Sequence, residues 1–513
     1  MKVVDRLASI LPGFLTWTVL LSPFLLSFHY PALIVSFVIV FDTYWLFRSI
    51  RLARNTIIAY RYMKRDQAID WSLKLASGPP KQKDGVDLVA SKFGPDELTH
   101  LILLIHYKES GDLLAHSIQS YVESNFPKSR FWLILASEER AKETAIPIFN
   151  NLKRVFGQHF AVFKQTLHPD GLPGEIRSKS SNATWAGKRI KELLEAEGLD
   201  FSQLVIHNFD ADTRVYPQYF DYVSYQYLTT VLGQPTSFQP IHLYSNNIWD
   251  TPAVMRIIAQ SSTIIFMHNT LRSHRFHHFS SRSDIFQTIV DINYWTVDAI
   301  PEDSRQFFDS FFRYQGKLVV QPLYIPLRMD AVLAQNYWST FKNQYRQLRR
   351  WAWGVSDFPY LIKRSIQDRQ VSWAKKLVRI IYLLESHLSW ATGSIIVSFV
   401  GWIPIILNRN FANTVIGYNF PSITRLILGM ALVGLIVVIA LSYLLLPPRP
   451  PHRPKAYYLN FLWQWLLVPV VSILISSVAA IDAQTRLMFG KYLEYQVTEK
   501  KSVGFTGRDA RQY

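Results

Sequence analysis

Leu204-Val205-Ile206-His207-Asn208-Phe209-Asp210-Ala211-Asp212 joins a short β-rich run to an acidic D-x-D triplet. Three similar runs precede it, at residues 101–106 (LILLIH), 131–136 (FWLILA) and 160–163 (FAVF). Segments with helical periodicity lie between the runs, such as residues 112–124 and 183–197. Strands that alternate with helices are typical of an α/β sheet, in which ligands bind at the carboxyl ends of strands. The triplet therefore stands where a binding site is expected.

The D-x-D triplet has the chemistry of a divalent cation site. Two carboxylates two residues apart at a strand end, Asp210 and Asp212, can hold a cation and, through it, a diphosphate. Oxygen ligands are those that Mg²⁺ and Mn²⁺ prefer. The same triplet also occurs in solvated turns, so the decision between the two interpretations depends on its companions in the sequence.

A second acidic motif follows in Ile300-Pro301-Glu302-Asp303. A carboxylate at this position can accept the proton of an acceptor hydroxyl as a general base. Acidic residues after a proline are also typical of the first turn of a helix. Both interpretations stay open on the sequence alone.

A third motif, Gln347-Leu348-Arg349-Arg350-Trp351, is a Q-x-x-R-W signature. Trp351 can stack on a sugar ring, while Gln347 and Arg350 can bind hydroxyl or phosphate groups. A basic aromatic helix that lies at a membrane surface would have the same composition. The signature stands before apolar runs of membrane length, which agrees with either interpretation.

Apolar runs of this length occur near both ends of the 513-residue chain. Residues 11–28 carry no charge, and only His29 and Tyr30 separate them from a second run that continues to Phe47. Later runs cover residues 388–407, 426–446 and 461–481. A spanning helix needs about 20 apolar residues, so five membrane segments are predicted. The first run is followed by a second apolar helix rather than a small-residue cleavage site, which favours a retained anchor over a cleaved signal.

Basic residues predict the topology of these segments. One group follows the second run: Arg48, Arg51, Arg54, Arg61, Lys64 and Arg65. Another connects the fourth and fifth runs: Arg449, Arg453 and Lys455. Both groups indicate the cytoplasmic side. Five crossings would place the basic C-terminal tail outside, so we expect either a broken or re-entrant helix at Pro469 or an additional crossing near residues 377–390.

The composition limits the kinds of partner and metal site that the protein can have. The net charge of +17 is concentrated in short juxtamembrane loops, where anionic lipid and membrane topology account for it, so no nucleic-acid partner is expected. The absence of cysteine excludes disulfides and thiolate metal sites.

Taken in order, the three motifs resemble the membrane-embedded family 2 glycosyltransferases, which include cellulose, chitin and hyaluronan synthases. The resemblance covers about residues 98–355. It implies an α/β glycosyltransferase A fold, inserted between transmembrane helices, that transfers a sugar from a nucleotide diphosphate sugar with inversion. Where the family has an aspartate after its second strand this chain has Glu138, and residues 277–281 (HHFSS) depart from the family's glycine-rich acceptor loop.

The resemblance assigns roles to residues of this sequence. The catalytic pair is Asp303 and Glu302, with Asp303 as the general base. Donor binding falls to Glu109, Glu138, Lys179 and Asp210, and metal binding to Asp210 and Asp212 with Mg²⁺ or Mn²⁺. Contact with the acceptor or the pyrophosphate falls to Trp295, Gln347, Arg350 and Trp351.

The expected organisation has five parts. They are a transmembrane hairpin with a basic linker (1–66), a cytoplasmic glycosyltransferase domain (95–355), amphipathic interfacial helices (356–387), transmembrane helices (388–490) and a cytoplasmic tail (491–513). The expected product is a growing polysaccharide made at the cell membrane from a nucleotide diphosphate sugar. Transfer to a membrane lipid is the alternative, and a silent scaffold or a transporter are the interpretations from other classes.

Overall fold

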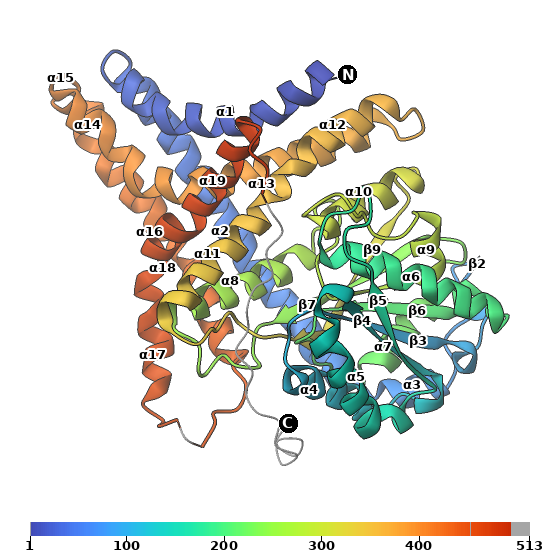
Figure 1. Ribbon diagram of the computed structural model, residues 1–513. Helices are drawn as coiled ribbons and strands as arrows, with labels where there is room; N and C mark the ends of the chain where they lie inside the picture. Colours follow the sequence, from blue (N-terminus) through green and yellow to red (C-terminus); the bar gives the residue numbers. More distant parts are fainter. Residues whose placement is uncertain (1, 452, 494–513) are drawn as a thin grey trace. The chain divides into compact units, whose positions relative to one another are not determined.

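The computed structural model describes residues 2–451 and 453–493, which fall into two units (Figure 1). The sheet unit contains residues 62–246 and 276–330, and the helical unit contains residues 2–61, 247–275 and 331–493. The expected cytoplasmic tail lies mostly outside the described residues. It therefore stays a prediction.

The sheet unit is built on seven strands in the order β5-β4-β3-β6-β8-β7-β9. Their bounds are β3 (Thr99–His106), β4 (Phe131–Glu138), β5 (Val162–His168), β6 (Leu204–Phe209), β7 (Thr236–Leu243), β8 (Arg282–Ile285) and β9 (Val319–Arg328). Strand β8 runs antiparallel to its neighbours β6 and β7, whereas all other pairs are parallel. A separate two-stranded sheet pairs β1 (Gln82–Lys83) with β2 (Val86–Asp87).

Helices cover both faces of the seven-stranded sheet. Ile102 and Leu104 of β3 belong to a cluster with α3 (Trp71–Ala76), α4 (Gly111–Val122), α5 (Lys142–Phe156) and α7 (Tyr219–Leu228). Leu101 and Leu103 belong to the opposite cluster, with α6 (Lys179–Ala196) and α9 (Phe286–Asp291). Successive side chains of a strand point to opposite faces, so a strand covered on both sides is apolar throughout. This is why the continuous apolar runs were recognisable as strands.

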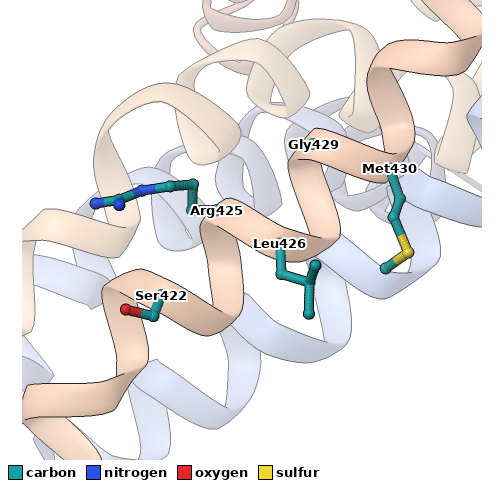
Figure 2. Close-up of a pocket in the computed structure, with 5 residues that line it drawn as sticks. All are labelled: Ser422, Arg425, Leu426, Gly429 and Met430. Carbon is teal, nitrogen blue, oxygen red and sulfur yellow. The ribbon is translucent and has the colours of Figure 1, made fainter.

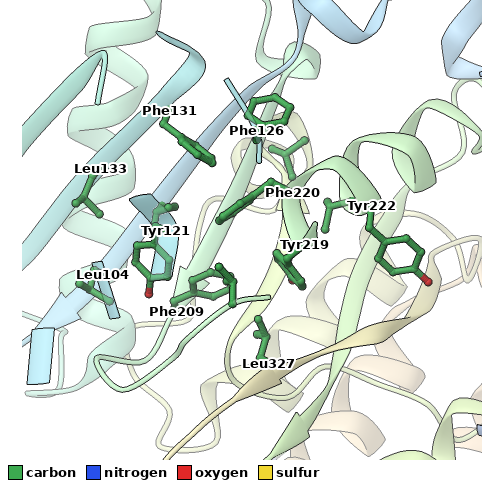
Figure 3. Close-up of a cluster of buried hydrophobic side chains, with 14 of the residues drawn as sticks. Leu104, Tyr121, Phe126, Phe131, Leu133, Phe209, Tyr219, Phe220, Tyr222 and Leu327 are labelled. Carbon is green, nitrogen blue, oxygen red and sulfur yellow. The ribbon is translucent and has the colours of Figure 1, made fainter. Parts of the chain in front are cut away.

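The first of these clusters is rich in aromatic rings (Figure 3). Among the rings, two histidines form a hydrogen-bonded chain across the sheet, with 2.7 Å between His100 Nδ1 and His207 Nε2. Their outer nitrogens lie 2.7 Å from the hydroxyls of Ser224 and Ser283. Burial lowers the pKa of both histidines, to about 3 for His207, so both rings are neutral and satisfied at neutral pH. This chain connects β3, β6, β8 and α7 inside the core.

The helical unit contains the long apolar helices. Its helices are α1 (Lys2–Ser27), α2 (Pro31–Ala68, which continues into the sheet unit), α8 (Ala253–Thr270), α11 (Tyr337–Ala352), α12 (Asp357–Gln367), α13 (Trp373–Phe399), α14 (Ile403–Leu407), α15 (Arg409–Ala412), α16 (Val415–Leu444), α17 (Tyr457–Trp463), α18 (Val468–Val470) and α19 (Val478–Met488). Within the described residues, five helical stretches are long and apolar enough to cross a membrane: Val3–Ser27, Pro31–Ala68, Trp373–Leu407, Val415–Leu444 and Tyr457–Met488. Their number equals that expected from the sequence.

Two details of these stretches differ from the expectation. Helix α13 begins at Trp373, so much of the segment expected as an interfacial helix is continuous with the third apolar run. Pro469 lies inside a continuous helical stretch rather than at a break between two helices. It is flanked by a 3₁₀ turn (Gln464–Leu467) and a π segment (Val471–Ser477), because proline lacks the N–H that the α-helical ladder requires.

The mixed sheet, its flanking helices and the apolar helices at both ends of the chain confirm the predicted fold class. The sheet unit is an α/β domain with a mostly parallel sheet, and its sequence is inserted between the long apolar helices.

Candidate active site

The two aspartates of the D-x-D triplet have different surroundings at the carboxyl end of β6. Asp210 Oδ1 accepts a hydrogen bond from Lys179 Nζ at 2.5 Å, and its side chain is 28% exposed. Asp212 is 1% exposed, and its Oδ2 accepts the backbone N–H of Asp330 at 2.8 Å. Asp210 is thus the accessible carboxylate, while Asp212 is anchored to the segment that follows β9.

The ammonium group of Lys179 lies near acids of both acidic motifs. It is the first residue of α6, which Ser178 caps, and its side chain is 11% exposed. Burial alone would lower the pKa of Lys179, but the carboxylates of Asp210, Asp303 and Glu302 outweigh burial and raise this pKa above its ordinary value. Lys179 is therefore charged at neutral pH. The fold brings together four groups from three segments that are far apart in the sequence.

Asp303 and Glu302 form the first turn of α10 (Glu302–Arg313), which confirms the helix start, and the general-base role of Asp303 stays a prediction. Asp303 Oδ1 accepts a hydrogen bond from Arg282 Nη1 at 2.6 Å. The Nε of the same guanidinium donates to Asp284 Oδ2 at 3.0 Å. Arg282 and Asp284 are both 1% exposed, whereas the side chain of Asp303 is 20% exposed. Arg282 therefore holds a partly accessible carboxylate in a fixed orientation.

Arg282 was not predicted as a site residue from the sequence. It begins β8, where it pairs with Asn208 of β6, so the antiparallel register places it beside the carboxyl end of β6. The available signal was the alternation Arg282-Ser283-Asp284, in which two opposite charges share one face of a strand. Ser281, directly before it, accepts the N–H of Asp210 on its hydroxyl at 3.1 Å.

The end of β7 adds two groups that are neutral at neutral pH. Burial lowers the pKa of His242 to about 4, although the carboxylates of Asp210 and Asp303 oppose this shift. Loss of hydration, and then the charges of Asp210 and Asp212, raise the pKa of Tyr244. His242 is fully buried, so only the half-buried, uncharged phenol of Tyr244 can hydrogen-bond a sugar hydroxyl without adding charge. Neither residue was predicted.

The acids at the ends of β3 and β4 are engaged locally. Glu109 Oε2 accepts the backbone N–H groups of Tyr107 and Lys108 at 2.7 and 3.1 Å, which fixes the loop after β3. Glu138 Oε2 accepts a hydrogen bond from Arg140 Nε at 2.7 Å. The guanidinium carbon of Arg140 lies 4.0 Å from the ring centre of Tyr107. Both acids stand at strand ends, as the sequence indicated, and their contact with a donor stays a prediction.

Trp295 requires a correction. It was assigned to the acceptor, but it is 1% exposed and lies in the core under α6, where its backbone N–H donates to Thr184 Oγ1 at 3.1 Å. A Cβ atom at Gly187 would lie 3.2 Å from its ring. The aromatic residue packs the helix against the sheet, so stacking of Trp295 on a sugar does not fit this position.

The Q-x-x-R-W residues lie on α11, which belongs to the helical unit. Gln347 Oε1 accepts a hydrogen bond from Gln344 Nε2 at 3.1 Å, and Trp351 packs against a cluster of buried apolar residues within the same unit. The adjacent Arg349, rather than Arg350, pairs with Asp482 of α19 at 3.0 Å. The helix is thus secured to the last apolar stretch. Contact of Gln347, Arg350 and Trp351 with a substrate stays a prediction.

The residues of the triplet fit a divalent cation that is shared with substrate phosphates. Within the described chain, no group of three or more His, Cys, Asp or Glu side chains is placed to hold a metal ion. Mg²⁺ is commonly held by only one or two carboxylates, with phosphate oxygens and water as its other ligands, and the triplet supplies that number. The helical unit also has a hollow along α16, lined by Ser422, Arg425, Leu426, Gly429 and Met430 (Figure 2). This lining contains no carboxylate or imidazole.

No protein-family model and no curated protein matches the chain. Among solved structures, it is similar to the mannosyltransferase PcManGT from Pyrobaculum calidifontis in complex with GDP-Man and Mn2+. The identity is 11% and the TM-score 0.44, over 89% of this chain and 100% of that one. It is also similar to S. aureus TarS 1-349 in complex with UDP-GlcNAc, with 10% identity and a TM-score of 0.36 over 80% of this chain and 99% of that one. At such low similarity, function must be argued from the site.

Proposed function

We propose that the protein is a membrane glycosyltransferase of family 2 that transfers a sugar from a nucleotide diphosphate sugar with inversion. The observation that carries the proposal is the pairing of Asp210 with Lys179 and of Asp303 with Arg282, both at one end of the sheet. Two accessible carboxylates, each held by a buried cation, provide separate positions for a donor diphosphate and an acceptor hydroxyl.

The reaction would be a single displacement. The acceptor hydroxyl oxygen attacks the anomeric carbon, the bond from that carbon to the diphosphate oxygen breaks, and Asp303 takes the hydroxyl proton. Attack on the face opposite the leaving group inverts the configuration, through a transition state with oxocarbenium character. Arg282 would keep Asp303 aimed at the hydroxyl, and Glu302 adds negative charge beside it.

Charge on the leaving group would be balanced from the other side of the site. A divalent Mg²⁺ or Mn²⁺ ion held by Asp210 and Asp212 would offset the charge that grows on the diphosphate. Lys179 would orient the phosphates through its ammonium group, which its acidic neighbours keep protonated. Glu109 and Glu138 stand at the strand ends where the nucleotide would bind, and Glu138 would act together with Arg140 and Tyr107.

The product we propose is a polysaccharide extended at the cytoplasmic face of the cell membrane. Support comes from the Q-x-x-R-W residues on α11, which would contact acceptor or pyrophosphate, and from the five apolar stretches. Basic residues after the second stretch favour a cytoplasmic sheet unit. A single transfer to a membrane lipid is the competing outcome.

Product analysis tests the proposal. Detergent-solubilised full-length protein is incubated with a panel of nucleotide sugars and Mg²⁺ or Mn²⁺, with Asp303→Asn as the inactive control. A ladder of products supports a polymer, and one added sugar supports a lipid acceptor. Absence of transfer and of donor hydrolysis across the panel would contradict the enzyme and favour a scaffold or a transporter.

A further inference from the structure

Four arginines gather in the helical unit near the polar end of the second apolar run. The arginine cluster consists of Arg48 and Arg51 of α2, and of Arg272 and Arg275 from the segment after α8. None of them belongs to the acidic motifs or to the Q-x-x-R-W signature. The cluster therefore needs an explanation of its own.

One carboxylate, Glu385, is shared by two members of the cluster. Arg48 Nη1 lies 2.9 Å from its Oε1, and Arg275 Nη1 lies 2.9 Å from its Oε2. Arg275 also stacks on Tyr382, with its guanidinium carbon 3.9 Å from the ring centre. The side chains of Arg48, Arg275 and Glu385 are 31%, 17% and 26% exposed, so a ligand can still reach them.

Arg272 lies deeper and has a neutral partner. It is 7% exposed, and its Nη1 lies 3.1 Å from His268 Nε2. Burial, followed by the nearby arginines, lowers the pKa of His268 to about 3, so the imidazole is uncharged. Burial and then Arg275, Arg51 and Arg48 lower the pKa of Arg272 to about 10. Among the described residues, no carboxylate pairs with Arg272.

The charge balance of the cluster is unfavourable by itself. A buried guanidinium without an anion loses hydration that a neutral imidazole does not restore. The described contacts give Arg48 and Arg275 one shared carboxylate, Glu385, and give Arg272 a neutral imidazole. A further anion would remove this penalty, and the fork of N–H donors on each guanidinium fits phosphate oxygens.

The position of the cluster indicates where such an anion comes from. Arg48 directly follows the apolar run that ends at Phe47, and Glu385, which both Arg48 and Arg275 contact, lies just before the apolar run of α13. This is the depth at which lipid head groups lie. Arginines that only set topology need no burial, and Arg54 and Arg61 of the same α2 are exposed, unlike Arg272.

We propose that the arginine cluster binds the phosphate group of an anionic membrane lipid. The hydroxyls of Tyr44 and Ser389, both bonded to the Arg48–Glu385 pair, border the same place. The site is independent of the sugar-transfer reaction, and its failure would leave the catalytic proposal untouched.

Lipid binding to the full-length protein in detergent tests this site. Native mass spectrometry is used with dioctanoyl phosphatidylglycerol, dioctanoyl phosphatidylcholine and inorganic phosphate as probes. We expect phosphatidylglycerol to bind about tenfold more tightly than phosphatidylcholine, and Arg272→Gln/Arg275→Gln to remove this preference. The matched control Arg54→Gln/Arg61→Gln removes two charges from the exposed side of α2 and should retain the preference.

A second variant covers the case in which the double substitution does not fold. Glu385→Gln removes the internal carboxylate, and we expect it to remain folded and to bind phosphatidylglycerol at least as tightly as the unchanged protein. Equal binding of the two lipids, equal loss in the control, or weaker lipid binding after Glu385→Gln would each overturn the proposal. Displacement of phosphatidylglycerol by equimolar inorganic phosphate would overturn the lipid assignment in favour of a soluble anion.

Discussion

The acidic groups at the two halves of the sheet's active edge are stabilised in different ways. At the ends of β3 and β4, Glu109 and Glu138 bind partners one or two residues away in the sequence. Beyond β6, Asp210 pairs with Lys179 across 31 residues, and Asp303 pairs with Arg282 across 21 residues. Local partners form without the fold, whereas the distant pairs exist only once the sheet is assembled.

We expect this difference to separate structural from catalytic charge. Glu109 accepts two backbone N–H groups of its own loop on one oxygen, and Glu138 accepts one side-chain N–H from Arg140. We expect a carboxylate held by one distant cation to face a substrate in a defined direction. Substitutions beyond β6 should therefore change the chemistry far more than substitutions at the ends of β3 and β4.

Asp303→Asn should have the largest effect. The amide cannot take the proton of an acceptor hydroxyl, so we expect kcat to fall by about 1,000-fold or more while donor affinity changes little. Asp309→Asn is the matched control, because Asp309 lies on the same helix and accepts the hydroxyl of Thr296 at 2.8 Å. Steady-state transfer and donor binding by calorimetry measure the two effects. Turnover near that of the unchanged protein would remove Asp303 as the base.

Arg282→Gln should have the next largest effect. Without the guanidinium, Asp303 loses its orientation, and we expect kcat to fall by about 100-fold with donor KM nearly unchanged. The substitution also leaves Asp284 buried without its cation, which should cost about 3–5 kcal/mol of stability. Thermal unfolding is therefore measured beside the kinetics.

The double variant Arg282→Gln/Asp284→Asn distinguishes positioning from folding. It removes the buried charge together with its partner, so stability should recover while kcat stays low. Recovery of both would show that Arg282 acts only on stability. Arg282→Lys should be intermediate, since one ammonium cannot form both bonds of the guanidinium fork.

Lys179→Met should act on donor binding, with a rise of about tenfold in donor KM. The carboxylates raise the pKa of Lys179 above 10.5, the ordinary value that the unfolded chain would have. The stabilising contribution of Lys179 is thus complete below pH 10.5 and is lost only as the pH rises through the higher folded value. The loss of stability in Lys179→Met should accordingly be constant from pH 6 to pH 9. A loss that varied across this range would contradict a permanently charged Lys179.

The strands that could be predicted are those with continuous apolar runs. β3, β4 and β6 are covered by helices on both faces, so each contains a run of consecutive apolar residues that is recognisable without its partners. Strand β8 is short and begins with Arg282-Ser283-Asp284, whose polar side chains bond both within the strand and to a distant segment. For this reason, neither the antiparallel strand β8 nor Arg282 was predicted from the sequence.

In the candidate site, as in the sheet, the residues that could be predicted are those with a local sequence signal. Asp210, Asp212 and Asp303 carry their signal in local motifs, and the fold places Asp210 and Asp303 near Lys179, a grouping that the motifs do not contain. Trp295 has the composition of a sugar-stacking residue, but its burial under α6 depends on Gly187, more than 100 positions earlier in the chain. Burial is a property of the assembled core, which a motif does not contain.

Glu138→Gln should have the smallest effect and is the sharpest test of the difference between the two halves. Glutamine keeps an acceptor for Arg140 Nε, so the stacking of Arg140 on Tyr107 should survive and donor KM should change by only about threefold. Arg140→Met removes the stack itself and serves as the comparison, with a larger rise in donor KM. If Glu138→Gln instead raised donor KM as much as Lys179→Met, Glu138 would bind the nucleotide directly. Both halves of the sheet edge would then contribute functional charge, and the length of sequence between partners would no longer separate the two kinds of acid.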